Sequence, residues 1–329
     1  MSLTNRLKLL KSYLKKSPIT ANKPLEIGVE LTNFCQLNCL MCNRQEMTRP
    51  LGEMSWELFT SLVDQTANEA EIYYLYGLGE PLLYKDLFKA IDYCHSKKVP
   101  VGVSTNANCL NEEKARLLID HAPEYILLAL DARTEDTYQK IRRGGNFVQT
   151  QENIKNYLRL VKQHRPKTFT ALLFVEQEAN KREARDFVRF WKDRGASAVR
   201  VKPAAPLISS NQTRTAPPRR CLFVYRTLNI TWQGDVYSCC LDTNCSFELG
   251  NLNNHSIEQL WNSERWQNLR KSFAKEQPPE LCRRCAVGQP SPPAVLGLSL
   301  FTDLTVKKAL VSLEKLPRLI QNISLWRRR

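Results

Sequence analysis

Between residues 26 and 203, short apolar runs alternate with longer amphipathic stretches. The apolar runs are rich in Val, Ile, Leu and aromatic residues, and they predict six strands. The stretches between them repeat apolar residues every three or four positions and predict six helices. The expected strands are 26–31, 72–76, 99–104, 125–131, 169–175 and 198–202, and the expected helices are 55–68, 84–97, 111–121, 134–141, 150–164 and 180–194.

Nearly continuous apolar strands separated by helices indicate a parallel sheet that is buried on both faces. The six strand–helix units therefore predict an α/β fold, a partial (β/α)6 TIM-like barrel. In such a barrel the loops that follow the strands build the active site, so the residues after each strand are the candidates for chemistry.

A different pattern begins at residue 203. Residues 203–218 are rich in Pro, Ser, Thr and Asn and predict a linker. Apolar runs at 223–231 and 236–239 flank a Trp-Gln-Gly-Asp turn and predict a hairpin, and residues 257–272 predict a helix. We expect four parts: a basic amphipathic N-terminal helix (1–25), the barrel (26–205), a small α+β domain (206–288), and a linker with a basic amphipathic C-terminal helix (289–329).

The net charge of +15 is concentrated at the two ends of the chain. Residues 1–23 hold six Lys and Arg and no acid, and residues 300–329 hold seven Lys and Arg against two acids. The body is only modestly basic, so we expect no nucleic-acid partner. Leucines recur at helical spacing beside the N-terminal lysines. Two alternatives follow: the tails contact a membrane peripherally, or they pack their apolar stripes against the barrel.

The sequence predicts a cytoplasmic protein. It contains no run of about 18 apolar residues, which argues against a transmembrane helix, and the six N-terminal cations interrupt any secretory signal. The 11 cysteines are odd in number and too few for a disulfide scaffold. In a reducing compartment, clustered thiols favour metal or redox chemistry.

Three cysteines follow the first expected strand in the pattern CxxxCxxC: Cys35, Cys39 and Cys42. Three thiolates in one loop can bind three irons of a 4Fe-4S cluster and leave the fourth iron open to another ligand. Zinc would need a fourth protein ligand, and none lies nearby in the sequence. Polar residues also follow the next three strands: Gly77-Leu-Gly79-Glu80-Pro81, Ser104-Thr-Asn106 and Asp131.

Over about residues 26–203 these motifs resemble those of radical S-adenosylmethionine (SAM) enzymes. The resemblance implies that Cys35, Cys39 and Cys42 hold a 4Fe-4S cluster whose open iron chelates the amine and carboxylate of SAM. It also implies the SAM contacts: Met41 near the adenine, Gly79, Glu80 and Pro81 at the ammonium, and Ser104 and Asn106 near the ribose or carboxylate. Asp131 either binds SAM or substrate or is a satisfied carboxylate at a strand end.

Two positions depart from the usual motifs of these enzymes. The turn reads Gly-Leu-Gly-Glu-Pro rather than Gly-Gly-Glu-Pro, and Ala107 stands where glycine is frequent. Neither change affects a cluster ligand.

A second group of cysteines follows residue 203: Cys221, Cys239, Cys282 and Cys285. Four thiolates suit either a fully ligated 4Fe-4S cluster or a tetrahedral zinc ion. With the hairpin, the group resembles the SPASM/twitch extension of radical SAM enzymes. Because no cysteine follows Cys285, the resemblance implies one auxiliary 4Fe-4S cluster, as in the shorter twitch form. Cys240 and Cys245 are alternatives to Cys239 as the ligand.

The resemblance implies an enzyme that cleaves SAM reductively. A low-potential donor such as flavodoxin or ferredoxin would supply the electron, and the resulting 5'-deoxyadenosyl radical would remove a hydrogen atom from the substrate. A fully ligated auxiliary cluster suits accepting an electron, so we expect a two-electron oxidation of an alcohol, a sugar or a peptide side chain. The sequence identifies no catalytic acid or base.

Two other functions fit the residues. One is a peptide-modifying maturase that forms crosslinks or oxidises side chains. Because the first expected strand begins near residue 26, we expect any leader-peptide binding to come from a separate partner. The other is a non-catalytic metal-binding interaction protein, against which the intact cysteine motif and Glu80 argue.

Overall fold

The structure, a computed structural model, describes residues 3–204, 220–283 and 285. These residues form an eight-stranded sheet in the order β6-β5-β4-β3-β2-β1-β7-β8. Neighbouring strands from β6 to β7 pair in parallel, and β8 pairs antiparallel with β7. The strands are β1 (Glu26–Val29), β2 (Ile72–Tyr74), β3 (Val101–Thr105), β4 (Tyr125–Ala129), β5 (Phe169–Glu176), β6 (Ala198–Pro203), β7 (Thr227–Ile230) and β8 (Val236–Tyr237). All six strands expected between residues 26 and 203 are present.

Several of the helices between these strands begin at a polar side chain that caps them. Ser55, Asn111 and Asn146 accept hydrogen bonds from the first turns of α2, α4 and α6. The α-helices are α1 (Leu3–Leu14), α2 (Trp56–Thr66), α3 (Leu87–Ser96), α4 (Glu112–Asp120), α5 (Glu135–Ile141), α6 (Phe147–His164), α7 (Ala184–Lys192), α8 (Phe223–Arg226), α9 (Ile257–Trp261), α10 (Glu264–Ala274) and α11 (Glu280–Arg283). Three 3-10 helices add η1 (Asn43–Glu46), η2 (Pro81–Leu83) and η3 (Lys181–Glu183).

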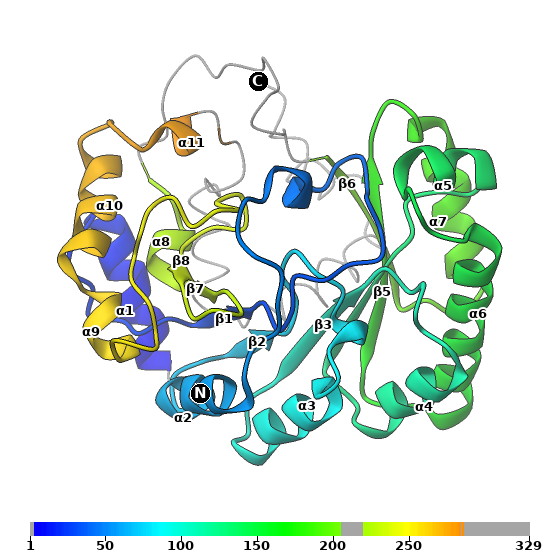
Figure 1. The fold of residues 1–329 in the computed structure, drawn as a ribbon, viewed down its shortest axis with the longest axis horizontal. Helices are drawn as coiled ribbons and strands as arrows, with labels where there is room; N and C mark the ends of the chain where they lie inside the picture. Colours follow the sequence, from blue (N-terminus) through cyan, green and yellow to red (C-terminus); the bar gives the residue numbers. More distant parts are fainter. Residues whose placement is uncertain (1–2, 205–219, 284, 286–329) are drawn as a thin grey trace.

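The sheet has a helix-covered outer face and an inner face. Figure 1 shows α2, α3, α4, α6 and α7 along the outer side of the curved sheet. The main apolar core lies between the sheet and these helices and includes Val103, Leu128, Phe174 and Trp191, none of which is exposed. A smaller apolar cluster lies on the inner face of β4, β5 and β6, and Met41 of the cysteine loop packs against it. This arrangement confirms the partial (β/α)6 TIM-like barrel.

The segment after residue 220 extends the same sheet. Four residue pairs join β1 to β7 in parallel, so the expected small α+β domain shares the sheet of the barrel. Residues 223–226 form the helix α8 and not the start of a strand, because the backbone turns there to bury Val224 and Tyr225. The expected single helix 257–272 is two helices, since Ser263 accepts a hydrogen bond from Trp266 N and starts α10.

The N-terminal helix α1 packs one face against the rest of the protein. Leu9 and Tyr13 are buried, and the Tyr13 ring meets the Tyr225 ring edge to face at 5.9 Å. The expected stripe differs from this face: Leu3, Leu7 and Leu14 are about half exposed. Among the described residues, no helix is both long and apolar enough to cross a bilayer. The expected C-terminal helix and most of the linker at 203–218 lie outside the described residues.

Candidate cluster and cofactor site

The cysteine loop follows β1 and is tied to the segment after α5. Leu40 donates its N–H to the carbonyl oxygen of Ile141 (2.8 Å), and Asn38 donates to that of Arg143 (2.9 Å). The loop carries Cys35 and Cys42, which are half-buried, and Cys39, which is buried. The three thiols therefore lie at the carboxyl end of the parallel strands, where the sequence predicts the site.

The chemistry of these thiols fits a cluster. Burial raises the pKa of Cys35 to about 11 and also raises the pKa of Cys39, so both release a proton when they bind metal. Among the described residues, no three His, Cys, Asp or Glu side chains are arranged to hold a single metal ion. In a 4Fe-4S cluster each thiolate binds a different iron, so the sulfurs need not converge on one point. Three thiolates in one loop match three irons of such a cluster, whereas a structural zinc ion takes four protein ligands.

Glu80 links the ends of β2 and β3 beside this loop. Its side chain is buried and accepts hydrogen bonds from Leu82 N (3.0 Å), Thr105 Oγ1 (2.7 Å) and Asn106 N (2.8 Å). Burial raises the pKa of Glu80, and the three hydrogen bonds act against that shift. Since a carboxylate offers about four acceptor positions, the chain itself occupies most of them.

Gly79 brings the Glu80 turn against the cysteine loop. A Cβ at Gly79 would lie 2.1 Å from the carbonyl oxygen of Thr32, and Glu80 N donates to Phe34 O at 2.8 Å. Only glycine allows this close approach of two backbones. Pro81 follows as the first residue of η2. The Gly-Glu-Pro turn thus lies beside the cysteine motif.

Asn106 connects the end of β3 to the cysteines. Its Nδ2 lies 3.7 Å from Cys35 Sγ, and its Oδ1 accepts a hydrogen bond from Gln36 Nε2 at 3.0 Å. Gln36 also donates to Cys109 Sγ at 3.3 Å, which gives Cys109 a neighbour that the sequence did not predict. Ser104, two residues before Asn106, is half-buried on β3.

Asp131 acts on the site through Arg142. Asp131 is fully buried; its Oδ2 pairs with Arg142 Nη2 at 2.5 Å, and its Oδ1 accepts from Val175 N at 2.7 Å. Arg142 Nη1 in turn lies 3.7 Å from Cys39 Sγ. Asp131 is therefore a satisfied carboxylate in this structure, and it orients a cation toward a cysteine of the loop.

The second group of cysteines lines one pocket. Cys221 precedes α8, Cys239 follows β8, Cys282 lies in α11, and Cys285 follows that helix; all four line the pocket together with apolar side chains such as Phe273. Burial raises the pKa of Cys221 to about 12. Four thiols around an apolar pocket fit a fully ligated cluster.

The remaining cysteines lie outside this pocket. Cys240 and Cys245 are not among its lining residues. Cys240 is exposed, and Cys245 lies near enough to Arg49 to be influenced by its charge. Cys94 is fully buried in the core, as its helical position predicts. The geometry thus favours Cys239 over Cys240 and Cys245 as the fourth thiol of the group.

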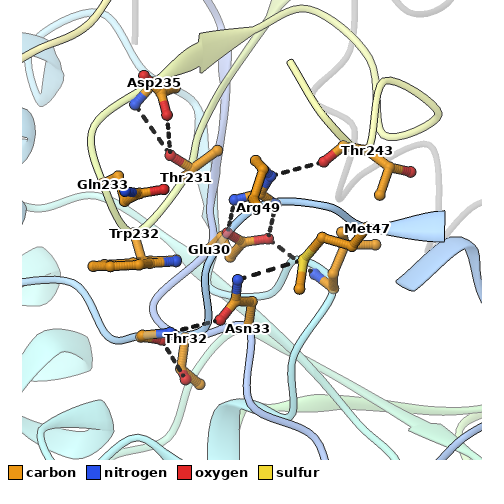
Figure 2. Close-up of polar contacts among 12 residues, drawn as sticks. Glu30, Thr32, Asn33, Met47, Arg49, Thr231, Trp232, Gln233, Asp235 and Thr243 are labelled. Atoms are coloured by element: carbon orange, nitrogen blue, oxygen red, sulfur yellow. Dashed lines mark hydrogen bonds and ion pairs between the residues drawn. The ribbon is translucent and has the colours of Figure 1, made fainter. Parts of the chain in front are cut away.

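A buried ion pair joins the segment after the cysteine loop to the region after residue 220. Arg49 donates from Nη1 and Nη2 to the two oxygens of Glu30, at 2.8 and 2.9 Å, and from Nε to Thr243 O at 2.8 Å. Figure 2 shows Arg49 between these two partners. Glu30 is fully buried, so the pair is shielded from solvent. Arg49 therefore connects the end of β1 to a residue close to Cys239.

Two further contacts strengthen this connection. Thr48 N donates to Asn244 Oδ1 at 2.8 Å, and Asn244 Nδ2 donates back to Glu46 O at 3.0 Å. Trp232, shown in Figure 2, donates to Pro50 O at 3.2 Å. We call the segment 46–52 with these partners the inter-region clamp. Both cysteine groups thus belong to one hydrogen-bonded structure.

Sequence reasoning did not identify Arg142 or Arg49. Arg142 lies in the Ile-Arg-Arg-Gly-Gly segment after the helix at 135–141, and its pairing with Asp131 and Cys39 depends on how the chain folds back. Arg49 contacts Thr243, which is 194 residues away in sequence. No local pattern signals either contact.

Comparison with known families identifies both halves of the chain. Residues 29–188 match the model of the radical SAM superfamily. Residues 221–286 match SPASM, an iron-sulfur cluster-binding domain. The two matches cover the two cysteine groups in the order in which they occur along the chain.

Individual relatives are distant. The antilisterial bacteriocin subtilosin biosynthesis protein AlbA of Bacillus subtilis is 24% identical over 295 residues, 79% of this chain and 65% of AlbA. The mycofactocin maturase MftC of Mycobacterium ulcerans is 28% identical over 133 residues, 40% of this chain and 36% of MftC. The chain therefore spans less than two thirds of the length of these relatives. Streptococcus suis SuiB bound to the precursor peptide SuiA has a similar fold, with a TM-score of 0.64 at 14% identity, covering 85% of this chain and 75% of SuiB.

Proposed function

The chain belongs to the radical SAM superfamily and carries a SPASM iron-sulfur cluster-binding region, and from this we propose that it oxidises a peptide substrate by two electrons. The family uses a SAM-binding 4Fe-4S cluster and SAM, and the SPASM region binds auxiliary iron-sulfur. The observation that carries the oxidative outcome is the pocket that Cys221, Cys239, Cys282 and Cys285 line together. A fully ligated cluster there has no open iron and suits taking up an electron.

The preference for a peptide rests on the relatives. AlbA takes part in bacteriocin biosynthesis, MftC is a maturase, and SuiB binds a precursor peptide. We extend that substrate class to this chain in place of the broader choice of alcohol, sugar or peptide. The second proposed partner is an electron donor of the flavodoxin or ferredoxin type, which would reduce the SAM-binding cluster.

We propose cluster and SAM ligands among the residues described above. The proposed ligands of the SAM-binding cluster are Cys35, Cys39 and Cys42, those of the auxiliary cluster are Cys221, Cys239, Cys282 and Cys285, and the proposed SAM contacts are Met41, Gly79, Glu80, Pro81, Ser104 and Asn106. When bound, the cluster held by Cys35, Cys39 and Cys42 together with SAM would supply a 5'-deoxyadenosyl radical able to remove a hydrogen atom from the substrate. The substrate radical would then have to lose a proton and one electron, and a cluster held by Cys221, Cys239, Cys282 and Cys285 would be suited to accept that electron.

The chain's own residues hold this chemistry in place. Arg142 provides a positive charge 3.7 Å from Cys39 Sγ, which favours the thiolate over the thiol. Glu80 fixes the ends of β2 and β3 relative to the cysteine loop through three hydrogen bonds. The buried apolar cluster of β4 and β5, against which Met41 packs, limits water in that part of the inner face, where a radical would otherwise be lost in side reactions.

Iron analysis and SAM cleavage test this function. We would measure iron, sulfide, EPR spectra and 5'-deoxyadenosine in the anaerobically reconstituted wild type, in Cys35→Ala/Cys39→Ala/Cys42→Ala, and in Cys221→Ala/Cys239→Ala/Cys282→Ala. We expect about eight irons in the wild type and about four in each variant, with cleavage lost in the first variant. The matched control, Cys240→Ser, should keep about eight irons. About four irons with about one zinc in the wild type would remove the electron acceptor and refute the oxidative outcome.

We also propose that α1 contacts membranes peripherally. Leu3, Leu7 and Leu14 stay about half exposed on a helix that also carries exposed lysines. An exposed apolar stripe beside cations is typical of helices that lie on anionic bilayers.

A further inference from the structure

Two cations lie on the inner face of β6. Side chains alternate along a strand, so Ala198, Arg200 and Lys202 share one face. Ala198 belongs to the inner apolar cluster. The register pairs Arg200 with Leu173 and Lys202 with Val175, which are members of the same cluster. Arg200 and Lys202 therefore stand on the face against which Met41 of the cysteine loop packs.

No described residue neutralises either cation. In the part of the chain that the structure describes, Arg200 and Lys202 make no hydrogen bond and no ion pair, and both are exposed. The neighbouring arginine of the site behaves differently, since Arg142 pairs with Asp131 at 2.5 Å. Within the described residues, the inner face of β6 thus carries two positive charges without an ion-pair partner, whereas the nearby Arg142 is paired with Asp131.

Charges from both cysteine-bearing regions act on Lys202. Desolvation, and then the Arg200 charge, lower the pKa of Lys202, while the charges of Cys240 and Asp131 act in the opposite direction. Asp131 belongs to the barrel and Cys240 follows Cys239 of the auxiliary pocket. Lys202 therefore lies within electrostatic reach of both regions, where a substrate of the proposed reaction would have to bind.

The two side chains suit one anionic group. Residues two apart on a strand are separated by roughly 6.6 Å along it, and both side chains are long enough to converge on one ligand. Arg offers a planar fork that matches carboxylate or phosphate, and Lys adds a compact positive charge. A neutral ligand would provide no negative charge to pair with either cation.

We propose that Arg200 and Lys202 form the subsite that binds a carboxylate or phosphate group of the substrate. The proposal rests on the proposed function, because it assigns the substrate to the inner face of the barrel. It makes the substrate an anionic molecule, such as a peptide with an acidic or phosphorylated residue at the reacting segment.

Calorimetric titration of the reconstituted, SAM-saturated holoenzyme tests this subsite. The probes are succinate, inorganic phosphate and the uncharged succinamide, and SAM is present so that its own carboxylate already occupies its site. We would compare the wild type with Arg200→Gln, Lys202→Gln and the double variant. The control is Arg159→Gln/Lys162→Gln, which removes two exposed cations from α6.

We expect succinate or phosphate to bind the wild type and succinamide not to bind. The preferred anion identifies a carboxylate or a phosphate as the group. Each single variant should weaken that binding roughly tenfold, as expected for the loss of one charge-assisted hydrogen bond. The control variant should bind as the wild type does, and the double variant should keep its affinity for SAM.

Three results would overturn the subsite. They are absence of anion binding by the wild type, equal binding by the wild type and the double variant, and a parallel loss of SAM affinity, which would assign the cations to the SAM carboxylate. A separate assay of 5'-deoxyadenosine formation shows whether the proposed function itself fails. In that case the wild-type enzyme with a reductant and SAM forms no 5'-deoxyadenosine, whatever the titrations show.

Discussion

Buried carboxylates around the cysteine loop each have a defined partner. Glu30 pairs with Arg49, Asp131 pairs with Arg142, and Glu80 accepts three hydrogen bonds from the chain. An unpaired buried charge costs several kcal/mol, so these contacts are conditions for folding as well as for the site. At the scale of single residues, the site is therefore built from carboxylates whose geometry is fixed before any cofactor binds.

Replacing Glu80 with Gln removes the negative charge of the side chain and keeps its size and shape. The amide nitrogen of Gln cannot accept the hydrogen bond from Asn106 N, so one backbone donor loses its partner in a buried position. We expect the free energy of unfolding to fall by about 1–3 kcal/mol and the affinity for SAM to fall at least tenfold. Urea unfolding and equilibrium SAM binding measure the two effects. Glu113→Gln, an exposed change on α4, is the control, and a Glu80 variant that matches it would refute this role.

Part of the site could be predicted from the sequence because its spacing is local. Cys35, Cys39 and Cys42 occupy one loop, so their pattern is visible without knowledge of the fold. The partners of Asp131 and Glu30 could not be predicted, since they depend on long-range contacts. The sequence left two roles open for Asp131, a ligand or a satisfied carboxylate. The contact with Arg142 in the structure decides in favour of the satisfied carboxylate.

The periodicity of apolar residues predicts the strands and helices of the barrel, and it predicts the elements after residue 220 less accurately. Buried parallel strands give nearly continuous apolar runs, so all six were predictable. The run Phe223–Ile230 is apolar enough for either a strand or a helix, and the packing of Val224 and Tyr225 decides in favour of a helical turn at its start. At Asn262 and Ser263 the helical pattern continues while the backbone restarts at a new cap.

The inter-region clamp is a structural element whose strength can be measured. Arg49→Met would leave Glu30 buried without a counter-charge and should destabilise the protein by about 3–5 kcal/mol. The double variant Glu30→Gln/Arg49→Met should lose less unfolding free energy than the two single variants lose in sum. We expect the difference to exceed about 1 kcal/mol, because either single change already breaks the ion pair. Urea unfolding of the three variants gives this coupling energy.

Arg44→Met provides a control for the Arg49 change. Arg44 lies in the same loop, and among the described residues its side chain donates one hydrogen bond, to Asn33 O at 3.0 Å. We expect it to cost about 1–2 kcal/mol and to show no coupling with Glu30→Gln. Equal coupling of Arg44 and Arg49 with Glu30 would show that the loop, and not the ion pair, carries the connection.

The exposed leucines of α1 predict that the protein binds anionic membranes. If its exposed leucines enter an anionic bilayer, the protein should co-sediment with phosphatidylserine vesicles and not with neutral phosphatidylcholine vesicles. Leu3→Ser/Leu7→Ser/Leu14→Ser should reduce this binding strongly, since each cation near the surface contributes only about 1 kcal/mol without the apolar contact. The control Ile19→Ser changes an exposed apolar residue outside the helix. Equal binding by both variants would contradict the role of α1.

At the scale of the whole molecule, the barrel and the auxiliary region share one sheet and one core. β7 pairs along the full length of β1, and Arg226, the last residue of α8, pairs with Glu26 of β1 at 3.0 Å. Trp261 donates to Asn22 O at 2.7 Å, which links the auxiliary helices to the segment before β1. The sheet itself therefore holds the two cysteine groups at a fixed separation.

This continuity predicts that the barrel does not fold independently of the auxiliary region. A chain ending at residue 204 loses β7, leaves β1 as an unpaired edge and removes the partner of Glu26. Because a domain is typically stable by only about 5–15 kcal/mol, we expect this loss to abolish a cooperative urea transition. A chain ending at residue 285 keeps every sheet contact described above and should retain the transition. If the shorter chain unfolded cooperatively at the same urea concentration as the longer one, the barrel would be a separate folding unit, and the pairing of β1 with β7 would not be required for its stability.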